Sequence, residues 1–227
     1  MTLTRRHALL ATAAVAALAG TARATLAADG IGAVESLENE AWGTQVGATR
    51  VALAEAAAIF RNQRVETGDE SATVIRFVDT SKLTLGENAS AVVDEYVYAG
   101  DASRSTTTLA KGAFRFISGQ MPEKNMKLKT PTVTIGIRGT ELKIDVYEDG
   151  STELSTIEGA ANIVSNITND ALDILAGQSV LADSNGVLGV IRDFIHKSKD
   201  ELIERGKSEI RDRLQIPDIP GIPNPFR

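Results

Sequence analysis

The feature that most constrains this fold is a series of short segments with alternating apolar and polar residues, separated by turn residues. From Ala72 onward the alternation is regular: Leu83 and Leu85, for example, fall on the same face of one segment. The dipeptide Asp149-Gly150, between two such segments, is typical of a tight hairpin turn. Turn signals recur about every 8–12 residues, as in a β-sandwich, a roll or a short solenoid. We therefore expect a mainly β domain of about ten short strands over residues 45–183, with no internal repeat to choose between these architectures.

The strongest strand preference lies in residues 130–140, which read Thr-Pro-Thr-Val-Thr-Ile-Gly-Ile-Arg-Gly-Thr. Pro131 cannot donate to a β-ladder, so it belongs at the beginning or the edge of a strand. Gly136 and Gly139 would permit close backbone approach. Arg138 would pair with an acid or with carbonyl groups in a partly buried network. The alternative for Arg138 is a binding role toward an anionic ligand.

Two earlier segments give weaker signals. Residues 25–44 are rich in Gly and Ala with little periodicity, and we predict a linker there with at most one short strand or helical turn near Leu37–Trp42. Residues 48–63 contain many alanines, which favours a helix by intrinsic propensity, although two short strands around a turn would also fit.

Residues 1–24 have the organisation of an export signal. Arg5 and Arg6 precede an apolar run over 8–20, and Ala22-Arg23-Ala24 offers an A-x-A cleavage site. The apolar run has 13 residues, too few to span a bilayer as a helix, so we expect no transmembrane segment in the mature form. Paired arginines and a mild apolar core resemble a twin-arginine leader, with a Sec signal as the alternative. Either route predicts a location in the bacterial periplasm.

The charge balance argues against nucleic acid as a partner. The chain has a net charge of −6, and without the three arginines of the leader 21 basic residues face 30 acidic ones, or −9. A surface of that sign repels phosphate backbones. One local basic cluster exists, which is either a solvated loop or a site for an anionic partner or glycan: Lys111, Arg115, Lys124, Lys127 and Lys129.

The sequence offers little for catalysis. It has no cysteine, which excludes disulfides and thiolate chemistry. Beyond the leader the one histidine is His196, and no G-x-S-x-G motif is present. Adjacent acids such as Asp94-Glu95 face opposite sides of a strand. We therefore expect no catalytic residue, no cofactor and no metal site, and a protein that is not an enzyme.

The C-terminal part changes character. Leu172–Leu175 and Ser179–Ala182 are expected to pair around a turn at residues 176–178. Residues 187–215 carry apolar residues at helical spacing, which predicts an amphipathic helix. That helix would dock on the β domain, mediate oligomerisation or recruit another envelope protein. The close prolines of residues 216–227 predict an extended tail.

Several segments together resemble the FecR-type periplasmic domain family, in order and in spacing over about residues 45–182. The strongest likenesses are Ile75–Gly86, Asp94–Tyr98, the K-G-x-F-R-F run Lys111–Phe116, Thr130–Thr140, Glu158-Gly159 and Ala176–Gln178. The residues that this likeness and the strand pattern single out as structural or interaction candidates are Gly112, Phe114, Arg115, Phe116, Thr130, Pro131, Gly136, Arg138, Gly139 and Thr140. The likeness also favours strands at Arg50–Leu53 and Ala58–Arg61 over a helix.

The resemblance implies a β-rich periplasmic domain. The best-known members of the family transmit a ferric-siderophore signal from an outer-membrane receptor to a sigma factor. Here a leader stands where those members have an anti-sigma segment and a transmembrane helix. The chain thus resembles stand-alone secreted members, which implies a sensing or protein-interaction module whose partner is another envelope protein. The alternative is a structural or ligand- or glycan-binding envelope module. One departure is Thr80, which follows Asp79 where the family usually has Gly, in a turn that favours positive φ.

Overall fold

The computed structural model describes residues 30–193, which form one continuous sheet of 15 strands. The leader 1–24, residues 194–215 of the expected helix and the tail 216–227 lie outside the described residues. The strands are β1 (Gly32–Glu38), β2 (Ala41–Thr44), β3 (Val51–Ala52), β4 (Ala58–Ile59), β5 (Arg64–Thr67), β6 (Ala72–Phe77), β7 (Lys82–Leu85), β8 (Ser90–Val97), β9 (Arg104–Ile117), β10 (Met126–Lys129), β11 (Val133–Val146), β12 (Thr152–Ser165), β13 (Ala171–Leu175), β14 (Gln178–Ala182) and β15 (Arg192–Asp193). Two 3-10 turns, η1 (Gly100–Ala102) and η2 (Glu123–Asn125), join them. Neither these turns nor any other part of residues 30–193 supplies a helix long and apolar enough to cross a membrane.

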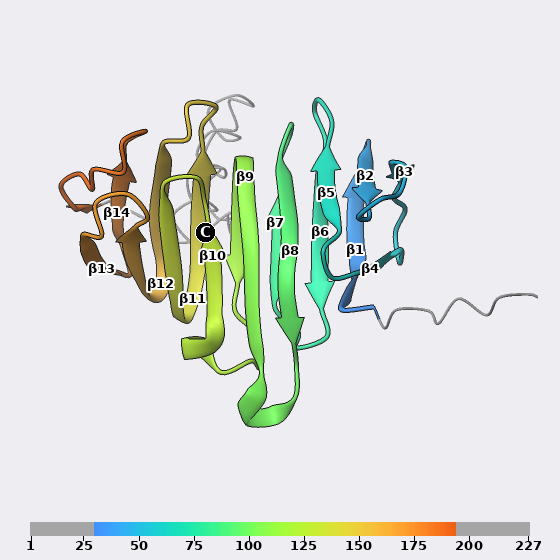
Figure 1. Ribbon diagram of the computed structural model, residues 1–227, viewed down its shortest axis with the longest axis horizontal. Coiled ribbons are helices and arrows are strands. Elements are labelled where there is room, and N and C mark those ends of the chain that lie inside the picture. The colour runs from blue at the N-terminus through green and yellow to red at the C-terminus, as the bar shows by residue number, and fades with distance from the viewer. Residues whose placement is uncertain (1–29, 194–227) are drawn as a thin grey trace, which may run out of the picture.

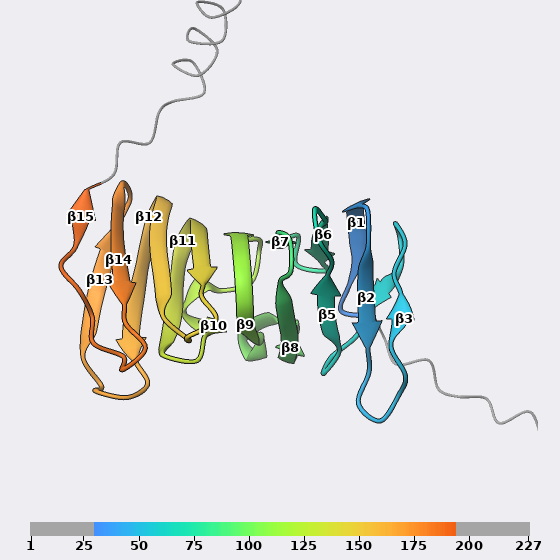
Figure 2. The ribbon, with the colours of Figure 1, turned by 90° about the horizontal axis from the view of Figure 1, so that it is seen from above.

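The sheet is folded into two layers, because the long strands β9, β11 and β12 each contribute one half to either layer (Figures 1 and 2). The front layer, nearer the viewer in Figure 1, has the order β13-β12-β11-β10-β9-β8-β5-β2-β3. The back layer has the order β15-β14-β12-β11-β9-β7-β6-β1-β4. β9 and β10 run parallel and the other pairs antiparallel, so the sheet is mixed.

A glycine with positive φ marks each crossing between the layers. Gly112 in β9 has φ 107°, Gly139 in β11 has φ 60° and Gly159 in β12 has φ 74°. A Cβ on Gly159 would lie 2.1 Å from the carbonyl oxygen of Gly139, and one on Gly112 would lie 2.5 Å from Cα of Ala89. At each of these two bends the glycine touches the backbone of a neighbouring segment, so a side chain would have no room there.

The core between the layers is built from aliphatic side chains on alternate strand positions. Its fully buried large members come from both layers: Ile59, Ile75, Leu83, Leu85, Leu109, Met121, Ile135, Ile137, Leu142, Ile144, Leu154 and Ile163. Each such side chain contributes about 1.5–3 kcal/mol when it is buried. A single cluster includes these residues, so the two layers share one core.

The prediction of a mainly β fold is confirmed, with more strands than expected because short strands at both ends escaped the pattern. The linker prediction is wrong from residue 32 onward, since β1 and β2 belong to the sheet. Six residues of β1 pair with β6, and Val34 and Ala41 are buried. Residues 48–63 form β3 and β4 around a turn at Ala56, whose φ is 63°, so the choice of strands over a helix is confirmed.

The prediction of an amphipathic helix over residues 187–215 is wrong for residues 187–193. The N–H of Asp183 donates to the carbonyl of Val187, that of Gly189 donates to Leu181, and β15 pairs with β14. These sheet-like hydrogen bonds outweigh a helical preference that Gly189 already weakens. The prediction that residues 172–175 and 179–182 pair with each other is also wrong. Instead, β13 pairs with β12 in the front layer, and β14 pairs with β12 in the back layer.

Candidate interaction surfaces

A buried polar network lies under the turn between β6 and β7. Oδ1 of Asp79, which has no exposed surface, accepts hydrogen bonds from the Tyr96 hydroxyl (2.7 Å) and from the Ser81 hydroxyl (2.6 Å). Burial, and then the bond to Asp79, raises the pKa of Tyr96, which keeps the phenol protonated as a donor. A Cβ on Gly119 would lie 2.2 Å from the Asp79 carbonyl oxygen. The motif residues here organise a turn.

The beginning of the 130–140 segment is a second structural cluster. The Thr130 hydroxyl accepts from the backbone N–H of Val133 (3.1 Å) and from the Thr152 hydroxyl (2.8 Å). The Thr132 hydroxyl donates to the Gly150 carbonyl at 3.0 Å. Pro131 is exposed just before β11 and lies beside Gly150. A position outside the strand suits proline, because it has no backbone N–H to donate to a β-ladder. These contacts fix the start of β11 against the Asp149-Gly150 hairpin.

The K-G-x-F-R-F segment likewise serves the fold. Gly112 bends β9, and Phe114 and Phe116 follow it into the core. Arg115 points outward from the back layer, where its guanidinium pairs with Glu141 at 2.7 Å. Thr140 is buried after the bend of β11, and its backbone N–H donates to the Ser118 hydroxyl at 3.0 Å.

The partly buried network expected around Arg138 is not observed. Its side chain is 61% exposed on the front layer, and the nearest acid in the described part of the chain is Asp173, at 4.0 Å. Gly136 also differs from the expectation of close backbone approach, since a Cβ there would meet nothing nearer than 3.8 Å. The two residues instead line a shallow depression on the outer front face, together with Lys124, Lys127 and Asn162.

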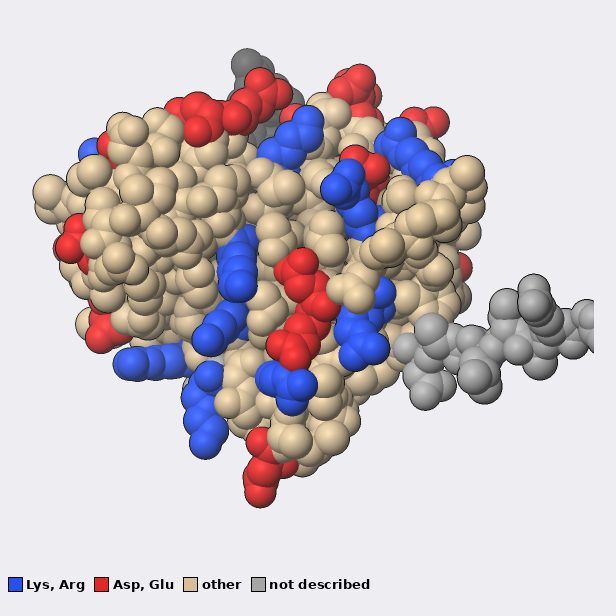
Figure 3. Space-filling model, viewed as in Figure 1, with Lys and Arg blue, Asp and Glu red and all other residues tan. Residues whose placement is uncertain are grey.

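The five-member basic cluster is divided by the crossing of β9. Lys127 and Lys129 point outward from β10 in the front layer, and Lys124 lies exposed in η2. Arg115 lies on the opposite, back face. Figure 3 shows basic side chains gathered over the β10 region of the front face, beside an acidic column. The basic residues that line one depression are Lys124, Lys127 and Arg138.

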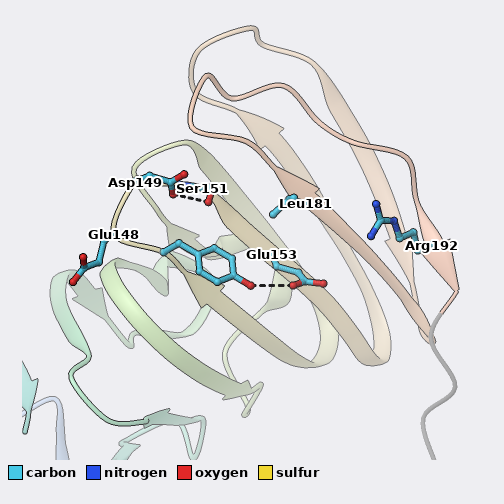
Figure 4. Close-up of a pocket in the computed structure, with 7 residues that line it drawn as sticks. Glu148, Asp149, Ser151, Glu153, Leu181 and Arg192 are labelled. Atoms are coloured by element: carbon cyan, nitrogen blue, oxygen red, sulfur yellow. Dashed lines mark hydrogen bonds between the residues drawn. The ribbon is translucent and has the colours of Figure 1, made fainter. Parts of the chain in front are cut away.

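A second depression, of about 510 Å³, lies on the back layer beside the 149–150 hairpin (Figure 4). The Tyr147 hydroxyl donates to Oε2 of Glu153 at 3.2 Å. The Ser151 hydroxyl and N–H both bond Oδ1 of Asp149 and lower its pKa. Glu148 points away from these groups in Figure 4. The acids here satisfy their own turn and strand, and residues 30–193 contain no group of three or more His, Asp or Glu side chains placed to hold a metal ion.

Within residues 30–193, the sheet has one extended unpaired edge. β3, β4 and β15, as described, have two residues each, whereas β13 has five and pairs only with β12. The N–H of Ser165 donates to the carbonyl of Asp170, and the N–H of Ala176 donates to the carbonyl of Gly159. Because hydrogen-bonded positions alternate along an antiparallel pair, these two bonds determine which residues of β13 direct their backbone groups toward β12. Ala171 and Asp173 therefore direct their backbone N–H and C=O groups away from β12.

Sequence reasoning missed the edge of β13, and also Asn162 and Asp173. Asn162 Nδ2 donates to Asp173 Oδ1 at 2.9 Å, across β12 and β13. Neither polar residue stands out in the sequence. A signal existed only in the alternation, which places both on the same outward face once β13 is paired with β12.

The fold and these surfaces define a two-layer β module with structural motifs in its interior and candidate interaction surfaces on its outside. Residues 63–162 match the family described as FecR protein, so this part of the chain is similar to that family. No curated protein matches the chain. Two crystal structures of a candidate anti-sigma factor from Parabacteroides distasonis, at 2.50 Å and 1.65 Å resolution, are similar, each with a TM-score of 0.48 and 12% identity. The alignment covers 58% of this chain and 59% of that one.

Proposed function

We propose that this protein is a non-enzymatic sensing and protein-interaction module of the bacterial envelope, linked to signal transduction and exported to the periplasm by its leader. The similarity of residues 63–162 to the FecR family supports the signalling role. The observation that carries the interaction role is the free edge of β13, where Ala171 and Asp173 offer backbone groups to an incoming strand. Strand addition to such an edge is a common mode of protein recognition.

The edge can be tested by capturing partners from envelope extract with the purified protein. Ala171→Pro removes one outward N–H without breaking the ladder to β12. Leu175→Lys places a charge on the edge, where Leu175 is 55% exposed. Both variants should lose a partner that the unaltered protein retains, whereas the control Leu181→Lys, at a 42% exposed position on the back layer, should retain it. Equal capture by all variants would contradict docking at β13, and capture of no envelope protein would contradict the interaction role.

Export is a separate part of the proposal. Replacing Arg5 and Arg6 by Lys should block secretion if the leader uses the twin-arginine route. Undisturbed secretion of that variant would favour the Sec route, and retention of the unaltered chain in the cytoplasm would contradict periplasmic function.

A further inference from the structure

A basic depression on the front layer is unusual in this acidic protein. Residues 124–140 contain three Lys and one Arg and no acid, whereas residues 30–193 as a whole contain 14 basic and 23 acidic residues. β10 runs between β9 and β11, so the sheet sets this segment in the middle of the front face. The local potential is therefore opposite in sign to that of the surroundings.

The depression has about 310 Å³ of space and a floor without a side chain. Gly136 forms that floor, and a Cβ there would make only an ordinary van der Waals contact, 3.8 Å from the carbonyl oxygen of Asn162. Lys127 pairs with Gly136 across the β10–β11 ladder, and Arg138 follows two residues along β11. Lys124 from η2, Asn162 from β12 and the apolar residues Met126 and Ile137 complete the lining. Three cations therefore reach one small hollow from three separate elements.

The cations are not neutralised from within the described residues. Lys124 and Lys127 make no ion pair with any described side chain, and Arg138 has only the 4.0 Å contact with Asp173. Asp173 is engaged by Asn162 at 2.9 Å, so it holds that amide in place at the rim. With three cations and one acid, the hollow keeps a net positive charge. The exposed guanidinium of Arg138 retains donors for a planar or tetrahedral anion.

We propose that this depression binds a single anionic group, a carboxylate or a phosphate, carried by a small ligand. The size of the hollow fits one such group with its immediate substituents. A long polyanion would meet the acids of β8, where Asp94 and Glu95 lie beside β9 on the same layer. This site is distinct from the β13 edge and does not rest on the proposed protein interaction.

The direct test is a calorimetric or NMR titration of the purified protein with inorganic phosphate, with glucuronate and with glucose as a neutral control. Saturable binding of glucuronate alone assigns a carboxylate ligand, and saturable binding of phosphate alone assigns a phosphate ligand. Binding of both shows that the site reads charge without distinguishing the groups. Glucose should not bind. Failure of both anions to saturate, or equal binding of glucose, would overturn the proposal.

Variants locate the site. Arg138→Gln and Lys127→Gln should each weaken anion binding about tenfold, because each removes charge-assisted hydrogen bonds. Arg64→Gln is the matched control, since Arg64 is exposed on β5 of the same face but outside the depression. Gly136→Val should abolish binding by filling the floor. All four variants should keep the melting temperature of the unaltered protein. Loss of binding in Arg64→Gln equal to that in Arg138→Gln would show a diffuse charge effect and refute the site.

Discussion

The Tyr96 hydroxyl donates a 2.7 Å hydrogen bond to Oδ1 of Asp79. Tyr96 belongs to β8 of the front layer, whereas Asp79 lies in the turn between β6 and β7 of the back layer, so the bond joins the layers across the core. The Tyr96 ring also stacks on Phe77, with 5.4 Å between centroids. A buried carboxylate without such donors would be strongly destabilising. The network therefore ties the two layers together at the N-terminal side of the sheet.

Tyr96→Phe should lower the free energy of unfolding by about 1.5–3 kcal/mol, because it leaves a buried acceptor with one donor fewer. Urea unfolding followed by circular dichroism measures the change. Tyr98→Phe is the control, since the Tyr98 hydroxyl makes only a 3.4 Å exposed contact with Gln120. Equal unfolding midpoints for the two variants would contradict a stabilising role for the Tyr96–Asp79 bond.

The raised pKa of Tyr96 makes stability depend on alkaline pH. In the unfolded chain the phenol ionises near its ordinary pKa of 10.0, whereas burial holds it protonated in the folded protein. Above that pH the unfolded state binds fewer protons than the folded state, so stability falls as pH rises. The contribution is fully present below pH 10 and declines above it. Urea midpoints at pH 8 and pH 11 should therefore diverge more for the unaltered protein than for Tyr96→Phe, and identical divergence would count against this linkage.

Replacement by alanine should destabilise the protein at Gly159, where β12 crosses between the layers, but not at Gly136, which lines the basic depression. Gly159→Ala forces a Cβ to within 2.1 Å of the Gly139 carbonyl at a φ of 74°, so it should cost more than about 2 kcal/mol. Gly136→Ala places its Cβ at an ordinary van der Waals distance, 3.8 Å, from the Asn162 carbonyl oxygen in a regular strand, so it should be neutral or stabilise by about 0.5–1 kcal/mol. Thermal unfolding of both variants decides the matter. A Gly159→Ala protein as stable as Gly136→Ala would show that the bend tolerates a side chain.

The sequence predicted the strands well and their arrangement poorly. Alternation identified the face shared by Leu83 and Leu85 in β7, because that strand packs one face on the core. Glu158-Gly159, one of the family likenesses, would fit a turn between two strands equally well, yet Gly159 bends the single strand β12 from one layer to the other. A local pattern cannot distinguish these cases, since both require positive φ. For the same reason the basic cluster was assembled by proximity in sequence, although the crossing of β9 sends Arg115 to the opposite face.

Arg138→Lys separates a structural role from a binding role. Because the Arg138 side chain is 61% exposed and its contact with Asp173 is 4.0 Å, the variant should change the free energy of unfolding by less than about 0.5 kcal/mol. Differential scanning calorimetry provides the measurement. A large loss of stability would contradict this expectation and favour a structural role for Arg138. Normal stability with weaker anion binding would agree with the proposed depression, because Lys lacks the forked donors of Arg.

Thr80 occupies a position that favours glycine. Its φ is 69°, in a region that costs a residue with a Cβ about 1–2 kcal/mol. Its side chain is exposed, so Thr80→Gly removes that strain without emptying the core. The greater freedom of glycine in the unfolded chain offsets part of the gain, which leaves an expected stabilisation of up to about 1 kcal/mol. Asn62→Gly is the matched control: Asn62 is also exposed and has φ 60°, but asparagine tolerates this conformation, so its replacement should change stability less. Urea unfolding of both variants checks this order, and a destabilised Thr80→Gly protein would mean that the threonine hydroxyl or methyl group stabilises the turn more than its backbone strain costs.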